Sequence, residues 1–188
     1  MKTNKITIGT ANFGYVYGVS KKIVSMTKAK SILKLASNLK VKNLDISEDY
    51  INSKKILINL KLKNFKLITK LSITDVIKHD NYLNFYNKIN EDLKKLGIKK
   101  YFAILVRRPD EFIRKDKYFY FLKKLRKSRL VDKVGYSIYD PKDLKKIYQY
   151  WKPDIVQIPY NLFDNRFCNT GWIDILYDDN VLIYARSV

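Results

Sequence analysis

The sequence contains one cysteine, Cys168, so the chain cannot form an internal disulfide bond. This use of cysteine fits a reducing compartment. Long apolar stretches are also missing: no run approaches the ~20 residues of a membrane span, and the basic start lacks the apolar stretch of a signal peptide. We therefore expect a cytoplasmic protein without a membrane partner. With 46% hydrophobic residues among 188, the chain can bury the core of a single domain over residues 1–188.

Acidic residues are few: 18 Asp and Glu stand against 38 Lys and Arg, for a formal net charge of +20. This excess fits a polyanionic partner such as nucleic acid or an acidic membrane face. It equally fits a lysine-rich composition spread over solvated helix faces. Lysines predominate, occur in every segment and form no clear basic-aromatic recognition motif, which favours the second interpretation and argues against nucleic acid. A basic surface still suits an anionic cofactor such as a dinucleotide.

Glycine is scarce, and the six glycines form neither a G-x-G-x-x-G motif nor a P-loop, which disfavours a dinucleotide-binding open sheet. Strand-length apolar runs instead alternate with segments of helical period. We expect strands at 6–9, 41–46, 66–71, 101–106, 133–137, 154–158 and 181–185. We expect helices at 28–39 with Thr27 as its cap, 54–60, 82–96, 117–127, 141–150 and within 171–177. This alternation predicts a parallel sheet with crossover helices, and by itself it does not separate a barrel from a doubly wound open sheet.

Three residues stand out because they end or follow the second and third expected strands: Asp45, Tyr50 and Lys70. Each alone has an ordinary structural interpretation as a turn residue, one of 15 tyrosines or one of many lysines. Together they suit carbonyl reduction, which needs a hydride donor and an acid for the forming alkoxide. A free tyrosine has a pKa of ~10, and lowering it by about two units takes roughly 3 kcal/mol. A lysine ammonium ~4 Å away can supply up to about 4 kcal/mol at an effective dielectric of about 20, and an aspartate keeps that lysine charged.

Seven short segments, in order and spacing, resemble the aldo-keto reductase family: IGTANFG at 8–14, LDISEDY at 44–50, LITK at 67–70, DLKKLG at 92–97, VGYS at 134–137, VQIPYN at 156–161 and ARS at 185–187. The resemblance implies a TIM-type (β/α)8 barrel that ends at about its seventh strand. It also implies an NAD(P)H-dependent oxidoreductase that reduces an aldehyde or ketone, a small-molecule carbonyl substrate, with Tyr50 as the acid and no metal. Six residues are implied to contact NADP(H) or NAD(H): Gly9, Thr10, Ser137, Gln157, Arg186 and Ser187.

Several positions depart from the family pattern. Arg107 occupies the position of the family's catalytic histidine, and the one histidine, His79, is expected to be a solvated loop residue. Ile51 stands where the family has glycine, Lys54 where it has an acidic residue, and Ile138 where it has asparagine. An arginine can still donate a hydrogen bond to a carbonyl oxygen, so Arg107 remains a candidate catalytic residue.

The length is the largest departure, because a complete barrel of this type needs ~250 residues. The last strand unit of the family is missing, which leaves strand edges unpaired and apolar surface uncovered. We therefore expect marginal stability, self-association or a complementing chain at the open barrel edge. Two interpretations of function follow: an active reductase, and a truncated or degenerate family member without efficient catalysis.

Overall fold

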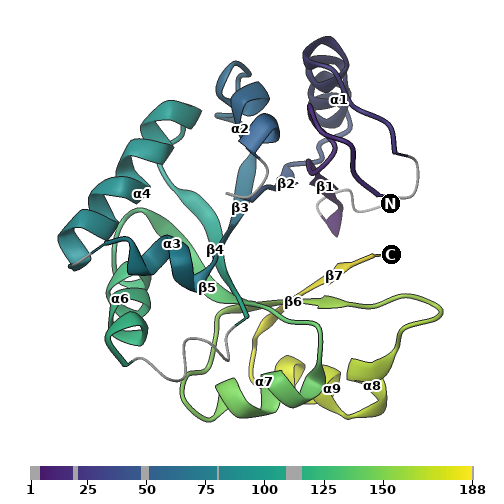
Figure 1. Ribbon diagram of the computed structural model, residues 1–188. Helices are drawn as coiled ribbons and strands as arrows, with labels where there is room; N and C mark the ends of the chain where they lie inside the picture. Colours follow the sequence, from purple (N-terminus) through teal and green to yellow (C-terminus); the bar gives the residue numbers. More distant parts are fainter. Residues whose placement is uncertain (1–4, 19–20, 48–50, 80, 109–115, 188) are drawn as a thin grey trace. The chain divides into compact units, whose positions relative to one another are not determined.

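The structure is a computed structural model that describes residues 5–18, 21–47, 51–79, 81–108 and 116–187 (Figure 1). The chain divides into two compact units. The first comprises Met1–Thr69 and Asn87–Phe102, and the second comprises Lys70–Tyr86 and Ala103–Val188. Each unit is described by itself.

In the part of the chain that the structure describes, seven strands alternate with helices. The strands are β1 (Thr7–Gly9), β2 (Asn43–Asp45), β3 (Lys66–Leu71), β4 (Tyr101–Arg107), β5 (Val131–Ser137), β6 (Ile155–Pro159) and β7 (Leu182–Arg186). The helices are α1 (Met26–Asn38), α2 (Ile51–Ile58), α3 (Ile73–Ile77), α4 (Tyr82–Leu96), α6 (Asp116–Arg126), α7 (Pro141–Tyr148), α8 (Arg166–Asn169) and α9 (Trp172–Asp178). The predicted alternation is confirmed, and α3 and α8 are additional.

The strand order settles the alternative that the pattern left open. The strands follow one another in the sheet in chain order, from β1 to β7. A doubly wound sheet instead reverses its order at a switch point, so this order excludes it. The pairs β1–β2, β2–β3, β5–β6 and β6–β7 are all parallel. The fold is thus a (β/α) barrel type that is incomplete at seven strands, as predicted.

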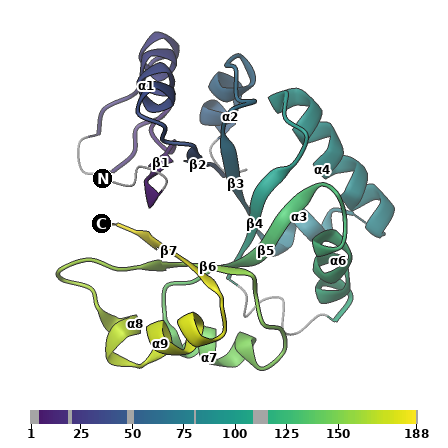
Figure 2. The same ribbon diagram turned by 180° about the vertical axis from the view of Figure 1, so that it is seen from behind.

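The first unit packs α1 and α2 beside β1, β2 and the start of β3 (Figures 1 and 2). Helix α1 buries Ala29, Leu33 and Ala36, which are three and four residues apart and form one apolar face. The predicted cap was wrong: the Ser25 hydroxyl, not that of Thr27, accepts a hydrogen bond from the Lys28 amide at 3.3 Å. Ser25 has extended backbone angles, whereas Thr27 already lies inside the helix.

The second unit has its core around β5 and β6. All five residues of β6 are buried, and α7, α8 and α9 are grouped beside β6 and β7 (Figures 1 and 2). Gly135 of β5 lies against β6 so closely that a Cβ built there would be 1.7 Å from the Ile155 carbonyl oxygen. The buried Tyr136 hydroxyl donates to the Trp151 carbonyl oxygen at 2.9 Å, and burial raises the pKa of this phenol.

Strand β7 differs from its neighbours because its side chains are exposed or half-buried along its whole length. Within the part of the chain that the structure describes, no helix is both long enough and apolar enough to cross a membrane.

Candidate functional site

The carboxyl ends of β1 and β2 in the first unit are joined through Thr10. This residue is fully buried, and both its amide and its hydroxyl donate to the Asp45 carbonyl oxygen, at 3.1 and 3.0 Å. The Thr10 hydroxyl also accepts a hydrogen bond from the buried Ser53 hydroxyl at 3.1 Å. These bonds fix the first turn of α2 against the strand ends. Gly9 ends β1 and is exposed, and Asp45 ends β2 and is half-buried.

A buried carboxylate connects α2 to α4 in the same unit. Asp92 is only 3% exposed, and one of its oxygens lies 3.1 Å from the Lys54 ammonium. The other lies 2.5 Å from the ammonium of Lys88, one helical turn earlier. Lys54 stands where the family has an acidic residue. Its partner is the Asp92 carboxylate, far along the chain, so the lysine is accommodated by an ion pair with a buried group.

The remaining candidates for catalysis lie in different parts of the structure. Tyr50 lies outside the described residues. Lys70 is a residue of β3 within the second unit, and only 7% of it is exposed. Arg107 ends β4 and is half-buried. His79 follows α3 and is half-buried, with its ring centroid 6.0 Å from that of Phe85.

The ends of β5 and β6 carry a buried pair of polar side chains. Ser137 and Gln157 occupy matching positions in the parallel ladder and are 4% and 2% exposed. The Ser137 hydroxyl donates to Oε1 of Gln157 at 3.1 Å. The ladder continues one residue further, because the Ile138 amide donates to the Gln157 carbonyl oxygen at 2.9 Å. The sequence predicted both residues as site residues, and the structure brings them together.

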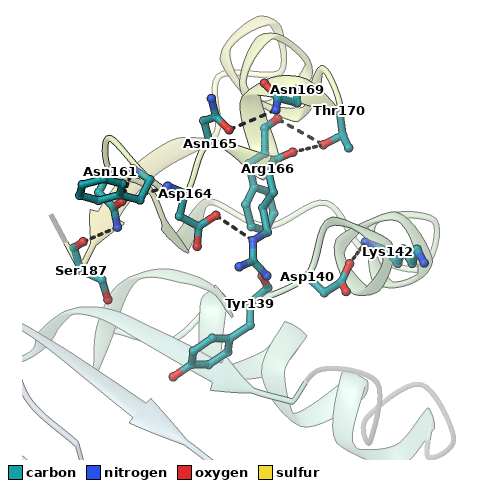
Figure 3. A network of polar contacts seen from close by, with 12 residues as sticks. Tyr139, Asp140, Lys142, Asn161, Asp164, Asn165, Arg166, Asn169, Thr170 and Ser187 are labelled. Carbon is teal, nitrogen blue, oxygen red and sulfur yellow. Dashed lines mark hydrogen bonds and ion pairs between the residues drawn. The ribbon is translucent and has the colours of Figure 1, made fainter.

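The loop after β6 folds against the end of β7 (Figure 3). Oδ1 of Asn161 accepts hydrogen bonds from the amides of Phe163 and Asp164, at 2.8 and 3.0 Å. The Asn161 side-chain amide donates to the Ser187 carbonyl oxygen at 2.7 Å, and the Tyr160 amide donates to the Arg186 carbonyl oxygen at 3.2 Å. These contacts fix the backbone of the two predicted site residues at the carboxyl end of β7.

Arg186 lies flat on an aromatic ring. Its guanidinium carbon is 3.5 Å from the centroid of Tyr139, which comes two residues after Ser137. Arg166 donates to the Tyr139 carbonyl oxygen at 3.4 Å and to the Asp164 carboxylate at 2.7 Å (Figure 3). The hydrogen bond from Arg166 holds the pKa of the Asp164 carboxyl below its usual value, and the charge of Arg186 acts in the same direction.

The sequence analysis did not single out Tyr139, Asp164 or Arg166. Tyr139 is one of 15 tyrosines, and Asp164 and Arg166 follow a segment that had been matched only as far as Asn161. No local pattern marks a ring that meets a guanidinium 47 positions later along the chain. Among the described residues, no group of three or more histidine, cysteine, aspartate and glutamate side chains could hold a metal ion.

Comparisons with known proteins agree with the fold and identify the family of the chain. The model of the Aldo/keto reductase family matches residues 5–188, which is nearly the whole chain and both units. A search of curated proteins found no match.

Solved structures show the same fold at low identity. A protein of Pseudomonas aeruginosa assigned as an aldo-keto reductase is 18% identical, with a TM-score of 0.75 over 95% of this chain and 71% of its own. An aldo-keto reductase of Bacillus halodurans in its holo form is 14% identical, with a TM-score of 0.72 over 96% of this chain and 61% of its own. The glycerol dehydrogenase of Gluconobacter oxydans is 15% identical, with a TM-score of 0.69 over 98% of this chain and 63% of its own. At these identities the likeness concerns the fold, and this chain spans about two thirds of the length of such structures.

The match of the family model, together with the sheet order and the polar residues at the strand ends, identifies the chain: it belongs to the aldo/keto reductase family.

Proposed function

We propose that this chain is an NAD(P)H-dependent oxidoreductase that reduces an aldehyde or ketone to an alcohol. The observation that carries the proposal is the buried hydrogen-bonded pair Ser137–Gln157 at the carboxyl ends of β5 and β6. In barrels of this type, residues at the carboxyl ends of the strands form the active site. Membership of a family of oxidoreductases over residues 5–188 supports the same conclusion and supports a single domain over 1–188.

The chemistry of Ser137 and Gln157 fits a nicotinamide cofactor. The Ser137 hydroxyl donates its hydrogen bond to Gln157, so the lone pairs of the Ser137 oxygen can accept a hydrogen bond from an amide N–H. A glutamine amide carries both a donor and an acceptor, which complements a carboxamide. We propose that these two residues hold the nicotinamide amide, and that Gly9, Thr10 and Ser187 contribute to the cofactor site. When bound, NADP(H) or NAD(H) supplies the hydride.

We assign the proton to Tyr50. A phenol is a poor acid at neutral pH, and a nearby ammonium lowers its pKa. We propose that Lys70 supplies this ammonium. Its side chain is almost completely buried, so its charge is weakly screened. Asp45 would keep Lys70 charged and oriented. Tyr50 then gives its proton to the oxygen of the carbonyl as that oxygen becomes an alkoxide.

Arg107 favours the second candidate function, a family member without efficient catalysis. This arginine ends β4 where the family has its catalytic histidine. A guanidinium donates hydrogen bonds but stays charged at all working pH values, unlike a neutral imidazole. It can orient a carbonyl oxygen, but its positive charge is permanent.

An isotope experiment tests the reductase proposal. The 188-residue chain is incubated with NADPH deuterated at the transferred position and a panel of aldehydes, and the alcohols are examined by mass spectrometry. The proposal expects one deuterium at the carbinol carbon, and it expects Tyr50→Phe to lower the rate at least about 100-fold. Tyr177→Phe serves as the matched control, because this tyrosine is 78% exposed on α9. A fully active Tyr50→Phe variant would remove Tyr50 from its assigned role.

We also propose that β7 is an association edge. Its exposed side chains and its place at the end of the sheet leave it open to pairing with another chain. Size-exclusion chromatography of the 188-residue polypeptide should give a species larger than one 22.3 kDa chain. Elution as a monomer that also melts in one sharp transition would contradict this proposal.

A further inference from the structure

Arg186 carries a pair of hydrogen-bond donors that its described neighbours do not use. Nε and Nη2 of its guanidinium are buried, and neither has an acceptor among the residues that the structure describes. Buried donors of a charged group are nearly always paired, because leaving them without a partner loses their hydration with no return. An edge of this kind therefore calls for an acceptor other than the residues that the structure describes.

The two donors share one edge of the guanidinium. Nε–H and one N–H of Nη2 point in parallel from the same side of the planar group. This is the edge that grips two oxygens of a carboxylate or a phosphate at once. A water molecule could satisfy one of these donors, whereas an oxyanion satisfies both and also neutralises the charge.

The carboxylate nearest in electrostatic effect is already engaged. Asp164 feels the charge of Arg186, but its oxygen accepts the hydrogen bond from Arg166 at 2.7 Å (Figure 3). The other carboxylate of this cluster, Asp140, acts on the charge of Arg166 and accepts a hydrogen bond from the Lys142 amide. Neither carboxylate accepts a hydrogen bond from Nε or Nη2 of Arg186, so this edge can still bind an anion.

The backbone around Arg186 is held in place. The Tyr160 amide donates to the Arg186 carbonyl oxygen, and the Asn161 side chain donates to that of Ser187. The Tyr139 ring lies over the guanidinium and is itself 63% exposed. The edge is therefore preorganised.

We propose that Arg186 is a specificity-determining residue that binds an oxyanion of the substrate, so that the preferred carbonyl compounds carry a carboxylate or phosphate group. This inference rests on the proposed reductase function, because it names the substrate class of that site. Arg186 lies at the carboxyl end of β7, in the same unit as Ser137 and Gln157. Its unpaired edge recognises the charged group and leaves the carbonyl for reduction elsewhere in the site.

The test compares two aldehydes of similar shape, 4-carboxybenzaldehyde and 4-methylbenzaldehyde, by calorimetric titration of the 188-residue chain with NADP⁺ present, so that the aldehyde binds and is not reduced. The wild-type chain should bind the carboxylate at least about tenfold more tightly, as a bidentate charge-assisted contact provides. Arg186→Gln should abolish this preference. Arg186→Lys keeps the positive charge without the two-donor edge, so this variant should retain only a small part of the preference for the carboxylate. Arg166→Gln is the matched control and should keep most of it, because Arg166 already has Asp164 as its partner.

Tyr139→Ala gives a result of the opposite sign. Removing the ring removes a competing cation–π contact, so the carboxylate should bind about threefold more tightly. A decrease instead would mean that the ring is part of the binding surface and would contradict this competition. Thermal melting of each variant checks that it is folded, and Arg186→Lys carries the test if Arg186→Gln does not fold.

Other outcomes separate this inference from its alternatives. An unchanged carboxylate preference in Arg186→Gln overturns it, and so does full retention in Arg186→Lys. If Arg186→Gln weakens NADPH tenfold and leaves the aldehyde preference intact, the oxyanion belongs to the cofactor and the substrate assignment is wrong. If no aldehyde is turned over while the carboxylate preference persists, the reductase proposal fails and the oxyanion site stands.

Discussion

The polar residues at the strand ends of the two units are used in different ways. In the first unit, the amide and the hydroxyl of Thr10 both donate to the Asp45 carbonyl oxygen. The Thr10 hydroxyl also accepts a hydrogen bond from the Ser53 hydroxyl. In the second, Ser137 and Gln157 pair with each other, and Arg186 keeps two buried donors without a described acceptor. One set of contacts joins strands and helix to each other, and the other presents groups that a ligand can complete.

This difference separates residues that stabilise the fold from residues that can bind a ligand. Buried hydrogen bonds that close within the protein contribute to folding, and their loss should lower the melting temperature. Groups that a ligand also contacts should show their loss in the affinity for that ligand as well.

The glycines of β1 and β5 should respond oppositely to alanine. Gly135→Ala places a methyl group 1.7 Å from the Ile155 carbonyl oxygen, so β5 and β6 must separate. We expect a loss of more than about 4 kcal/mol of unfolding free energy, or failure to fold. Gly9→Ala meets nothing within 4 Å and should change stability by less than about 0.5 kcal/mol. Urea denaturation measures both, and a stable Gly135→Ala variant would contradict the close approach of the two strands.

The Asp92 ion pair should come next in size. Asp92→Ala leaves the Lys54 ammonium, whose side chain is 16% exposed, without this carboxylate. Breaking such a pair from one side costs about 3 kcal/mol of stability. The double variant Asp92→Leu with Lys54→Met should recover most of the loss, because no charge is left buried. Asp143→Ala is the control, since its pair with Lys146 is exposed and worth little. Equal melting of the two alanine variants would show that Asp92 contributes no more than a surface charge.

Serine-to-alanine substitutions in the two clusters separate folding from ligand binding. Ser53→Ala and Ser137→Ala each remove one buried hydrogen bond, so each should cost about 1 kcal/mol of stability. Ser137→Ala should also weaken NADPH binding roughly tenfold, the equivalent of one hydrogen bond, whereas Ser53→Ala should leave it unchanged. Melting curves and cofactor titrations on both variants give the result. Equal effects on the cofactor would remove the distinction between the clusters.

The smallest effect concerns acid sensitivity in the second unit. Hydrogen bonds from Lys152 and then Tyr148 hold the pKa of Asp179 below its ordinary value of 3.8. A group with a lowered pKa stabilises the folded state above its unfolded pKa, and that contribution is lost as the pH falls through the folded value. The melting temperature should therefore fall between pH 5 and about pH 2 by more in the wild-type chain than in Asp179→Asn. Parallel curves for the two proteins would show that Asp179 makes no such contribution.

Much of the fold could be predicted from the sequence because its apolar pattern is local. The bounds of β3 and α4 are as predicted, since a buried strand and a 15-residue amphipathic helix leave strong patterns. Helices α3 and α8 are five and four residues long, too short to show a period. Helix α3 is capped by the Ser72 side chain and Asp75, whereas α8 has no side-chain cap and buries Phe167.

The candidate site was predicted less completely because its contacts join distant positions. Ser137 and Gln157 were found through short motifs, and the parallel register then brings them together. The Lys54–Asp92 pair and the stack of Arg186 on Tyr139 have no motif, since each depends on how helices and strands pack. Lys54 stands where the family has an acidic residue, and its buried partner Asp92 lies far along the chain.

Titration of the 188-residue chain with NADPH, followed by tryptophan fluorescence, tests the central claim most directly. The account predicts saturable quenching that Gln157→Ala weakens at least about tenfold, while Tyr50→Phe leaves the affinity unchanged. An absence of binding at millimolar NADPH and NADH, with a folded protein, would contradict the claim that the ends of β5 and β6 form a nicotinamide site.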